Sequence, residues 1–314
     1  MDSPIVIAVL GPTASGKSAL ALDLAARYGG EIVNCDSTAV FRGFDIGTDK
    51  VPLDQQRGIP HHLIDVADPT DDYTAAQYAR DAAACIRDIR RRGRMPIVAG
   101  GTGFYYRALT RGLFPGPGRD AQLRTRLAGI ADRRGAAFLH RMLARVDSSS
   151  ARRIQPNDVK RMIRALEVYW LTGRPLTDHF ADTVAPIPDM RVIGVALKLP
   201  ASETSDRVTR RVDQQFARGV VDEVRRLLER GVPETARPFG GLVYRQVLDL
   251  LHAVRSERAT RELIAQENRH YARRQLIWFR KEPNLTWFDG PGESAATIAR
   301  VHAFIDERLK EIGR

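Results

Sequence analysis

The sequence predicts an α/β fold in which a parallel β-sheet core is interrupted by a helical insertion domain. Three short apolar segments lie near the N-terminus, at 5–10, 32–35 and 96–99, and amphipathic segments at about 18–28 and 74–92 separate them. Strands that alternate with helices are typical of parallel sheets with right-handed crossovers. A long helical stretch without strand-like runs follows, and a further strand candidate lies at 192–197.

The bulk composition is that of an ordinary globular protein. The chain has 314 residues, 43% hydrophobic and 28% charged, and this length suits about two domains. It contains no stretch of about 18 apolar residues, so we expect no membrane span. The first residues include an acid where a signal peptide would carry bases, and we interpret them as leading into the first strand.

The net charge of +11 favours an anionic partner such as nucleic acid. The alternative is a general bias of composition, because arginine is far commoner than lysine. The two cysteines, Cys35 and Cys85, form no disulfide framework and have no metal-ligand spacing. A reducing cytoplasm therefore suits the chain best. Cys85 recurs with Tyr78, Ala82 and Ile89 at helical spacing, which predicts a packed thiol.

Changes in composition along the chain indicate the domain boundaries. Segment 113–120 is rich in proline and glycine, and Arg-rich helical segments extend from there to about residue 180. A second proline-containing break precedes the strand candidate at 192–197. We therefore expect a core formed by 1–114 and 190–314, with C-terminal helices, and a helical insertion at 115–189.

The turn after the first strand has the pattern of a phosphate-binding loop. Gly11, Gly16, Lys17 and Ser18 satisfy G-x-x-x-x-G-K-[ST], with a strand before and a helix after. In such loops, backbone N–H groups converge on phosphate oxygens, the lysine adds charge and the serine hydroxyl can hold Mg²⁺. The alternative is a tight turn that merely contains glycines. The pattern predicts a P-loop NTPase-like core for a di- or triphosphate with Mg²⁺, and leaves ATP and other organic diphosphates open.

Other candidate residues follow the remaining strands, where ligands bind in parallel sheets. Asp36, after the second strand, is either a general base or an acid that closes a turn. Thr102, after the third, either hydrogen-bonds a substrate or caps the next helix. Arg207 and Arg211 lie on one helical face after the returning strand, where either could reach the phosphates and stabilise a departing charge.

Two basic segments suit nucleic acid. A helix beginning near Asp158 has a predicted buried stripe and a separate cationic face, which binds RNA or is simply solvated. The stripe comprises Val159, Ile163, Leu166 and Trp170, and the face comprises Lys160, Arg161 and Arg164. The second segment, 268–281, interleaves arginines with aromatic residues that either contact nucleic acid or pack in the core.

Together these residues resemble the tRNA dimethylallyltransferases, also called tRNA isopentenylpyrophosphate transferases. The resemblance covers nearly the whole chain and is carried, in order, by GPTASGKSALA, DSTAVFRGFDIGTDK, PHHLIDVADP, RMPIVAGGTGFYYRAL, NDVKRMIRALEVY, VYRQVLDLL and ARRQLIWFRK. It implies that the loop binds dimethylallyl diphosphate rather than ATP, and that the insertion grips the anticodon stem-loop of tRNA. The implied reaction transfers the dimethylallyl group to N6 of the adenine 3′ to the anticodon and releases diphosphate.

The resemblance also implies roles for individual residues. Asp36 acts as the base, Thr102 fixes the flipped adenine, and Lys17 and Arg211, together with Mg²⁺, neutralise the leaving diphosphate. The implied diphosphate-binding residues are Gly11, Pro12, Thr13, Ala14, Ser15, Gly16, Lys17, Ser18 and Arg207, with Ser18 as the metal ligand. The implied tRNA-binding residues are Asp36, Ser37, Thr38, Ala39, Thr102, Lys160, Arg161, Met162, Ile163, Arg164, Tyr244 and Arg245.

Four positions depart from the family pattern. Ala39 and Lys160 stand where glutamine is expected, Phe41 replaces tyrosine, and Val243 replaces a glycine. None lies in the phosphate loop or at Asp36 or Thr102, so the reaction is unaffected and the reading of the RNA sequence is in question. We further expect a cytoplasmic monomer without membrane contact.

Two other functions remain open from the residues. A small-metabolite kinase of the same fold would use ATP and would have no use for the basic helical insertion. An RNA-binding NTPase switch would show nucleotide-dependent affinity for RNA without prenyl transfer. An apolar strand that ends in aspartate, the usual partner of a motor-type phosphate loop, is not evident, and this argues against the second alternative.

Overall fold

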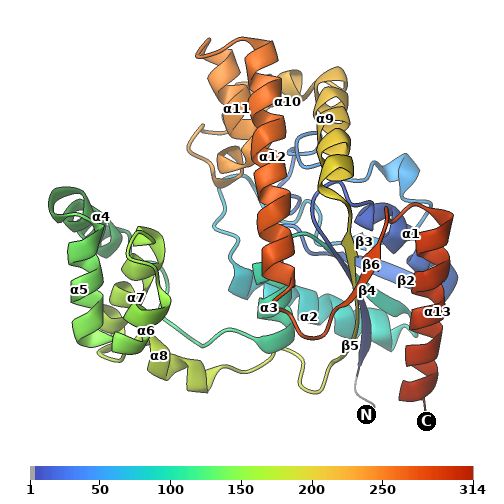
Figure 1. Ribbon diagram of the computed structural model, residues 1–314, viewed down its shortest axis with the longest axis horizontal. Coiled ribbons are helices and arrows are strands. Elements are labelled where there is room, and N and C mark those ends of the chain that lie inside the picture. The colour runs from blue at the N-terminus through green and yellow to red at the C-terminus, as the bar shows by residue number, and fades with distance from the viewer. Residues whose placement is uncertain (1–3, 314) are drawn as a thin grey trace. The chain divides into compact units, whose positions relative to one another are not determined.

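The computed structural model describes residues 4–313, which form two compact units (Figure 1). The larger unit joins the chain up to Thr110 with the chain from Ile187 onward, and the smaller unit is Arg111–Pro186. The predicted insertion agrees with the smaller unit to within four residues at both ends, 115 against 111 and 189 against 186. The Pro/Gly-rich segment that suggested the first boundary therefore lies just inside the smaller unit.

The larger unit is built on a six-stranded sheet with the strand order β3-β2-β4-β1-β5-β6. Every neighbouring pair is parallel. The strands are β1 Ile5–Leu10, β2 Gly30–Asn34, β3 His61–His62, β4 Met95–Gly100, β5 Arg191–Lys198 and β6 Thr286–Asp289. Leu10 is aligned with Gly100 on one side and with Ala196 on the other. The segments that follow β1, β2 and β4 therefore meet at one edge of the sheet.

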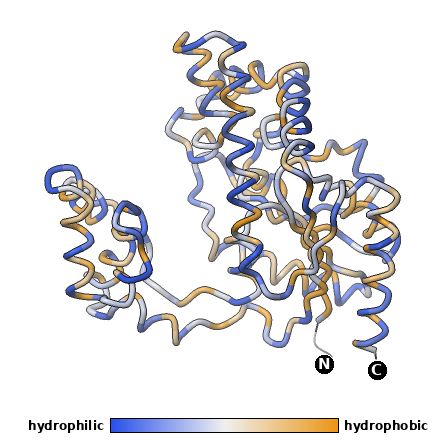
Figure 2. Tube along the Cα trace, in the orientation of Figure 1, coloured by the Kyte–Doolittle hydropathy of each residue, from blue (hydrophilic) through white to orange (hydrophobic). Residues whose placement is uncertain are grey.

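Four of these strands confirm the prediction of a parallel sheet. The short edge strands β3 and β6 were not predicted, since two and four residues are too few to show periodicity. The central strands are hydrophobic along their length (Figure 2), because both faces of the sheet are covered. Ile7, Val9, Ile97 and Val195 pack in one cluster with α1 and α13, which include Leu24 and Val301 respectively.

Helices surround the sheet and extend beyond its carboxyl edge (Figure 1). In the larger unit they are α1 Lys17–Tyr28, η1 Leu53–Gln55, α2 Ala75–Arg91, α3 Gly103–Arg111, α9 Ala201–Ala217, α10 Val220–Glu229, η3 Arg237–Gly240, α11 Leu242–Leu251, α12 Glu257–Phe279 and α13 Ala295–Ile312. Tyr78, Ala82 and Ile89 of α2 are fully buried as predicted, while Cys85 is half-buried. None of the helices in the described part of the chain is long and apolar enough to cross a membrane.

The smaller unit is entirely helical except for an isolated bridge between Leu113 and Val184. Its helices are α4 Ala121–Arg134, α5 Ala136–Val146, α6 Ser148–Arg153, α7 Val159–Thr172, α8 Leu176–His179 and η2 Phe180–Asp182. Asp158 caps α7 by accepting a hydrogen bond from the backbone N–H of Arg161, so the predicted start of this helix is confirmed. Leu127, Leu143 and Leu166 contribute to a separate hydrophobic core.

The buried side of α7 differs from the predicted stripe. Ile163 and Leu166 are buried as expected, but Trp170 is 44% exposed and Met162 is fully buried instead. Glu167 is also fully buried, where it pairs with Arg124 and Arg164. A helical wheel based on apolar residues alone does not predict the buried side of α7, because that side includes an ion-paired glutamate.

Candidate active site

The phosphate loop connects β1 to α1 at the carboxyl edge of the sheet. Ala14 and Gly16 adopt the left-handed backbone conformation, with φ of 62° and 83°. Lys17 Nζ folds back to donate to the carbonyl oxygen of Pro12, at 3.3 Å. Ser15 is buried, and Ser18 is exposed at the start of α1. The N–H groups that begin α1 receive no side-chain cap from the described residues, so this helix terminus is left for an anion.

Gln275 of α12 ties the phosphate loop to the end of β4. Its side-chain oxygen accepts from the backbone N–H of Thr13 at 2.8 Å, and its amide nitrogen donates to the carbonyl oxygen of Gly101, also at 2.8 Å. The side chain is almost fully buried. Sequence reasoning assigned it no role, because its partners lie far away in the chain.

Cations gather over the loop in a cavity of about 390 Å³. It is lined by Ala14, Gly16, Lys17, Ser18, Asp49, Arg207, Arg210, Arg211, Gln214 and Glu293. Burial, and then the charge of Arg211, lower the pKa of Lys17 to about 8, while the charges of Asp36 and Asp49 act in the opposite direction. An anion in this cavity would relieve the repulsion between the cations.

Both predicted arginines contact the loop. Arg207 Nε donates to the carbonyl oxygen of Ala14 at 2.7 Å, and its Nη2 donates to Glu293 at 2.5 Å. Arg211 Nη1 donates to the hydroxyl of Thr13 at 2.9 Å, and its Nε donates to Asp49. The position four residues apart on α9 therefore brings both guanidinium groups to the phosphate loop, as expected.

Asp49 is a further residue at this site that sequence reasoning did not single out. Its carboxylate accepts from Arg211 and, at 2.7 Å, from Gln215 Nε2. Its backbone has a positive φ of 51°. The only signal in the sequence was its place in the segment DIGTDK, which helped to carry the family resemblance.

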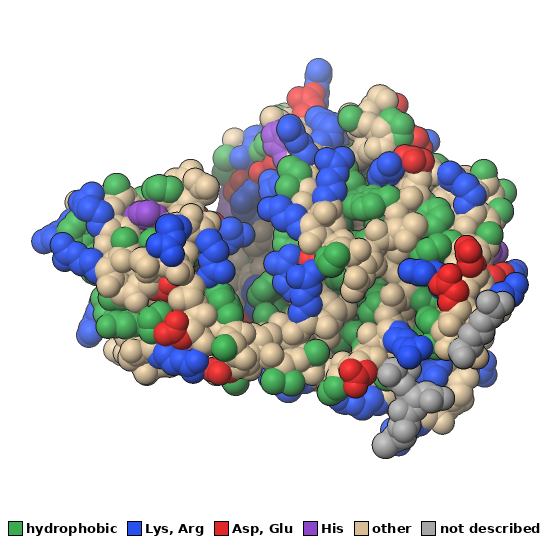
Figure 3. Space-filling model, turned by 60° about the horizontal axis from the view of Figure 1, so that its bottom comes forward, with side chains coloured by type: hydrophobic (Ala, Val, Ile, Leu, Met, Phe, Trp, Pro, Cys, Tyr) green, Lys and Arg blue, Asp and Glu red, His purple; other side chains and the backbone are tan. Residues whose placement is uncertain are grey.

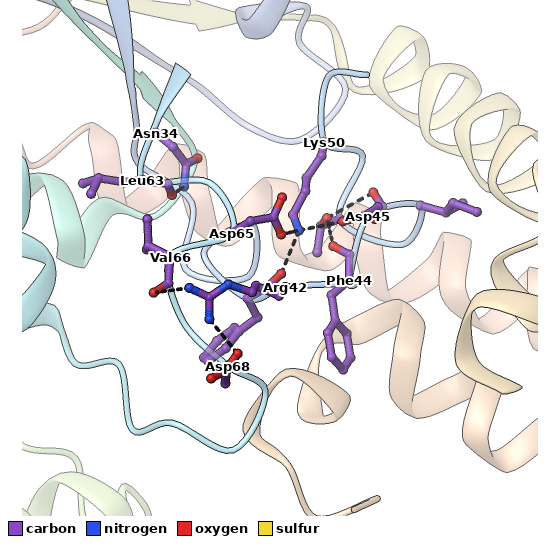
Figure 4. A network of polar contacts seen from close by, with 12 residues as sticks. Asn34, Arg42, Phe44, Asp45, Lys50, Leu63, Asp65, Val66 and Asp68 are labelled. Carbon is purple, nitrogen blue, oxygen red and sulfur yellow. Dashed lines mark hydrogen bonds and ion pairs between the residues drawn. The ribbon is translucent and has the colours of Figure 1, made fainter. Parts of the chain in front are cut away.

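A buried lysine holds the loop that presents Asp49 (Figure 4). Lys50 Nζ donates to the carbonyl oxygen of Phe41 at 2.7 Å, to Asp45 at 2.7 Å and to Asp65 at 2.5 Å. These three contacts gather segments on both sides of the loop around one ammonium group. Asp49 is thereby fixed beside α9 by its immediate neighbour in the chain.

Asp36 closes a turn and also faces a cavity. Its Oδ1 accepts from the backbone N–H of Thr38 at 2.9 Å and from the Thr38 hydroxyl at 2.6 Å. Oδ2 has no hydrogen-bond partner among residues 4–313. Asp36 lines a second cavity of about 150 Å³ together with Lys17, Asp49 and Arg211. Asp36 can therefore close the turn through Oδ1 and still have Oδ2 free to act as a general base, so the two roles that the sequence left as alternatives are compatible.

Thr102 lies next to this cavity. Its hydroxyl accepts from the backbone N–H of Ser37 at 3.0 Å and donates to the Ser37 hydroxyl at 3.3 Å. Tyr271 of α12 lies near Thr102 and Gln275, and burial, followed by the charge of Asp36, raises the pKa of Tyr271. Thr102 also accepts the first backbone hydrogen bonds of α3 through its carbonyl oxygen. Its hydroxyl is thus positioned by Ser37, in the turn after β2, rather than used as a helix cap.

The site offers a partial coordination shell for Mg²⁺. Ser18 lines both cavities, and Asp49 does so too. Within the described residues there is no cluster of three or more His, Cys, Asp or Glu side chains that could hold a metal alone. A bound ion would therefore be completed by phosphate oxygens and water, which is the usual arrangement for Mg²⁺. The residues present fit the ion in that sense.

Several residues expected to bind tRNA have buried side chains. Tyr244 is 1% exposed, donates to Glu223 at 2.7 Å and accepts from the Gly47 N–H at 3.0 Å. Val243, at the position that departs from the family pattern, is also buried. The ring of Tyr244 therefore supports the loop before Asp49, and the assignment of this residue to tRNA binding stays a prediction. Arg245 is half-exposed and pairs with Glu267.

On α7, the predicted cationic face is smaller than expected. Lys160 and Arg161 are exposed, but Arg164 donates to Glu167 at 2.7 Å and to the carbonyl oxygen of Pro117 at 3.0 Å. The side chains of Met162 and Ile163 are buried, and the assignment of these two residues to tRNA binding stays a prediction. Of the three cations, Lys160 and Arg161 remain open to solvent. Figure 3 shows many Lys and Arg side chains on the face of the protein that it presents.

Beside the phosphate loop, Ala39 is 6% exposed and lines the smaller cavity, and Phe41 is buried.

In the basic segment 268–281, Phe279 is fully buried. The guanidinium carbon of Arg107 lies over Trp278, 4.2 Å from the centre of the Trp278 ring. The aromatic residues there are therefore largely structural, while Arg273 and Arg274 are exposed. Core packing, one of the two roles that the sequence left open for these aromatic residues, is thus seen for Phe279, and contact of the segment with nucleic acid stays a prediction.

The strand order, the loop after β1 and the paired cavities define a phosphate-loop α/β protein with an inserted helical unit. A family model described as IPP transferase matches residues 39–282. The chain belongs to this family, as its sequence motifs indicated.

Individual relatives cover nearly the whole chain. The tRNA dimethylallyltransferase of Solibacter usitatus is 49% identical over 309 residues, which is 96% of this chain and 99% of that protein. The full-length tRNA isopentenylpyrophosphate transferase of Bacillus halodurans superposes with a TM-score of 0.74 at 34% identity, covering 99% of this chain and 98% of that one. A eukaryotic dimethylallyltransferase acting on tRNA superposes with a TM-score of 0.81 at 25% identity, covering 98% of this chain and 80% of that one.

Proposed function

We propose that this protein transfers a dimethylallyl group from dimethylallyl diphosphate to N6 of the adenine 3′ to the anticodon in tRNA, releasing diphosphate. The observation that carries the proposal is that Lys17, Asp36 and Arg211 line one cavity beside the phosphate loop. This unites a general base with the cations that a diphosphate leaving group needs. The names of the relatives that match the whole chain support the same reaction.

The reaction forms a bond between N6 and the allylic carbon and breaks the bond from that carbon to the diphosphate oxygen. The electron pair of the broken bond leaves with diphosphate, and the proton lost by N6 passes to Asp36 Oδ2. An aromatic amine is a weak nucleophile, so the base contributes to the rate. Lys17, Arg211 and the loop N–H groups stabilise the charge that develops on the leaving oxygen. Mg²⁺, held by Ser18 and the phosphates, would add to this neutralisation.

An adenine stacked in the anticodon loop cannot reach this cavity, so it enters flipped out of the stack. Thr102 would hold it, since its hydroxyl accepts from the Ser37 N–H at 3.0 Å but donates only a long hydrogen bond of 3.3 Å, to the Ser37 hydroxyl. On binding of the adenine, the Thr102 hydroxyl exchanges that weak contact for a hydrogen bond to the adenine. Lys160 and Arg161, on the smaller unit, supply positive charge for the RNA backbone.

The test is a transfer reaction without ATP. The protein is incubated with Mg²⁺, unmodified tRNA and radiolabelled dimethylallyl diphosphate, and label is measured in the RNA. Transfer to the adenine beside the anticodon, lost in Asp36→Asn, is the expected result. Absence of transfer, together with phosphate transfer from ATP to a small molecule, would assign a kinase instead. ATP-dependent RNA binding without transfer would assign an RNA-binding switch.

A further inference from the structure

The phosphate loop is contacted by an acidic side chain from the far end of the sequence. Glu293, between β6 and α13, accepts a hydrogen bond of 2.5 Å from Arg207 Nη2. The preceding residue, Gly292, donates its N–H to the carbonyl oxygen of Ser15 at 2.9 Å. Glu293 also lies so close to Gly16 that a Cβ atom there would fall 2.0 Å from Oε2. A carboxylate therefore stands inside the cavity that phosphates are expected to enter.

The two acids of this cavity are held differently. Asp49 accepts from Arg211, Gln215 and Arg218, and its side chain is 21% exposed. Glu293 is 46% exposed, and among the described residues Arg207 is its one hydrogen-bond donor. Asp49 is thus fixed by several partners, whereas Glu293 can leave by giving up a single contact.

Arginine binds a carboxylate and a phosphate with the same planar array of N–H donors. Arg207 keeps one of these donors, Nε, on the carbonyl oxygen of Ala14, so the loop contact does not depend on Glu293. Glu293 occupies a second donor, on Nη2, which faces the cavity beside the phosphate loop. A diphosphate in the cavity would compete with Glu293 for this donor and would also be repelled by its charge.

We propose that Glu293 is a displaceable internal anion that lowers the affinity of the phosphate loop for diphosphate and so aids release of the product. The inference rests on the proposed function, because it requires diphosphate to bind in this cavity. With the site empty, the carboxylate partly neutralises the cations over the loop. When diphosphate is bound, Glu293 swings aside into solvent, and its return to Arg207 accompanies product release.

The experiment measures binding of inorganic diphosphate to the full-length protein by calorimetry, in Mg²⁺ and in EDTA. The variants are Glu293→Gln and, as a matched control, Glu203→Gln. Glu203 also faces Arg207, but at 4.0 Å and outside the cavity. We expect Glu293→Gln to bind diphosphate up to about fivefold more tightly than the wild type, the range that follows from loss of one exposed ion pair. The gain should shrink at high salt, and Glu203→Gln should change little.

Product inhibition gives a second measurement in the transfer reaction. Glu293→Gln should be inhibited by diphosphate at a correspondingly lower concentration. Equal affinity in the wild type and Glu293→Gln would overturn the inference while leaving the proposed function intact. Weaker binding in the variant, confined to Mg²⁺, would overturn it in favour of metal ligation by Glu293. Failure of the wild type to bind either diphosphate or dimethylallyl diphosphate would overturn both proposals.

Discussion

Replacing Gln275 with leucine should both destabilise the protein and weaken its phosphate site. Leucine has a similar volume, but it removes the two hydrogen bonds that join Thr13 to Gly101 through the glutamine side chain. Because Gln275 is 6% exposed, water cannot easily replace the lost partners. Each of the two buried groups left unsatisfied costs about 1–3 kcal/mol, so we expect a loss of about 2–6 kcal/mol.

Thermal and urea denaturation measure this loss. At about 2–4 °C per kcal/mol, the value for domains of roughly 150–250 residues, the melting temperature should fall by roughly 4–24 °C. Binding of inorganic diphosphate should weaken as well, since the loop backbone is no longer anchored at Thr13. Gln266→Leu, which alters an exposed glutamine of the same helix, is the matched control. A melting temperature for Gln275→Leu that equals that of the control would refute the bridging role.

Other expected outcomes concern the reaction, the RNA and pH. Asp36→Asn should lower kcat by about 10²–10⁴-fold with little change in tRNA affinity, and an equal loss of both would assign Asp36 to binding. Combined replacement of Lys160 and Arg161 by alanine should weaken tRNA binding and reduce its salt slope by up to about 2. Arg164→Ala should mainly lower the stability of the smaller unit. If it reduced the salt dependence of tRNA binding as much as Lys160→Ala or Arg161→Ala, the internal contacts of Arg164 with Glu167 and Pro117 would not be its main role. Since Lys17 has a pKa of about 8 and binds anions only when protonated, diphosphate affinity should fall as pH rises through 8. Lys17→Arg should abolish that decline, and an unchanged profile would exclude Lys17 as the titrating group.

The catalytic edge of the sheet could be predicted because its signals are local. The phosphate loop, the strand before it and the helix after it lie within one short segment, and Asp36 follows directly on the next strand. The start of α7 was equally accessible, since Asp158 caps it through the backbone three residues ahead. In each case the residues that determine the structure are neighbours in the sequence.

The supporting contacts could not be predicted because they join distant segments. Gln275 reaches Thr13 across 262 positions, and Arg207 reaches Ala14 across 193. The packing of Tyr244 could not be predicted for the same reason, since its family motif does not reveal that the ring is buried against the loop before Asp49. The buried Glu167 shows that ion pairing, as well as apolarity, determines which side of α7 faces inward.

The bridge made by Gln275 also has a consequence for biosynthesis. The phosphate loop lies within the first twenty residues to be translated. The side chain that anchors it, Gln275, is translated about 260 positions later. Strand β5, which pairs with β1, likewise appears only after the whole helical insertion. We therefore expect the nascent chain to remain unable to grip diphosphate until α12 has left the exit tunnel, so that a truncated product cannot sequester the prenyl donor.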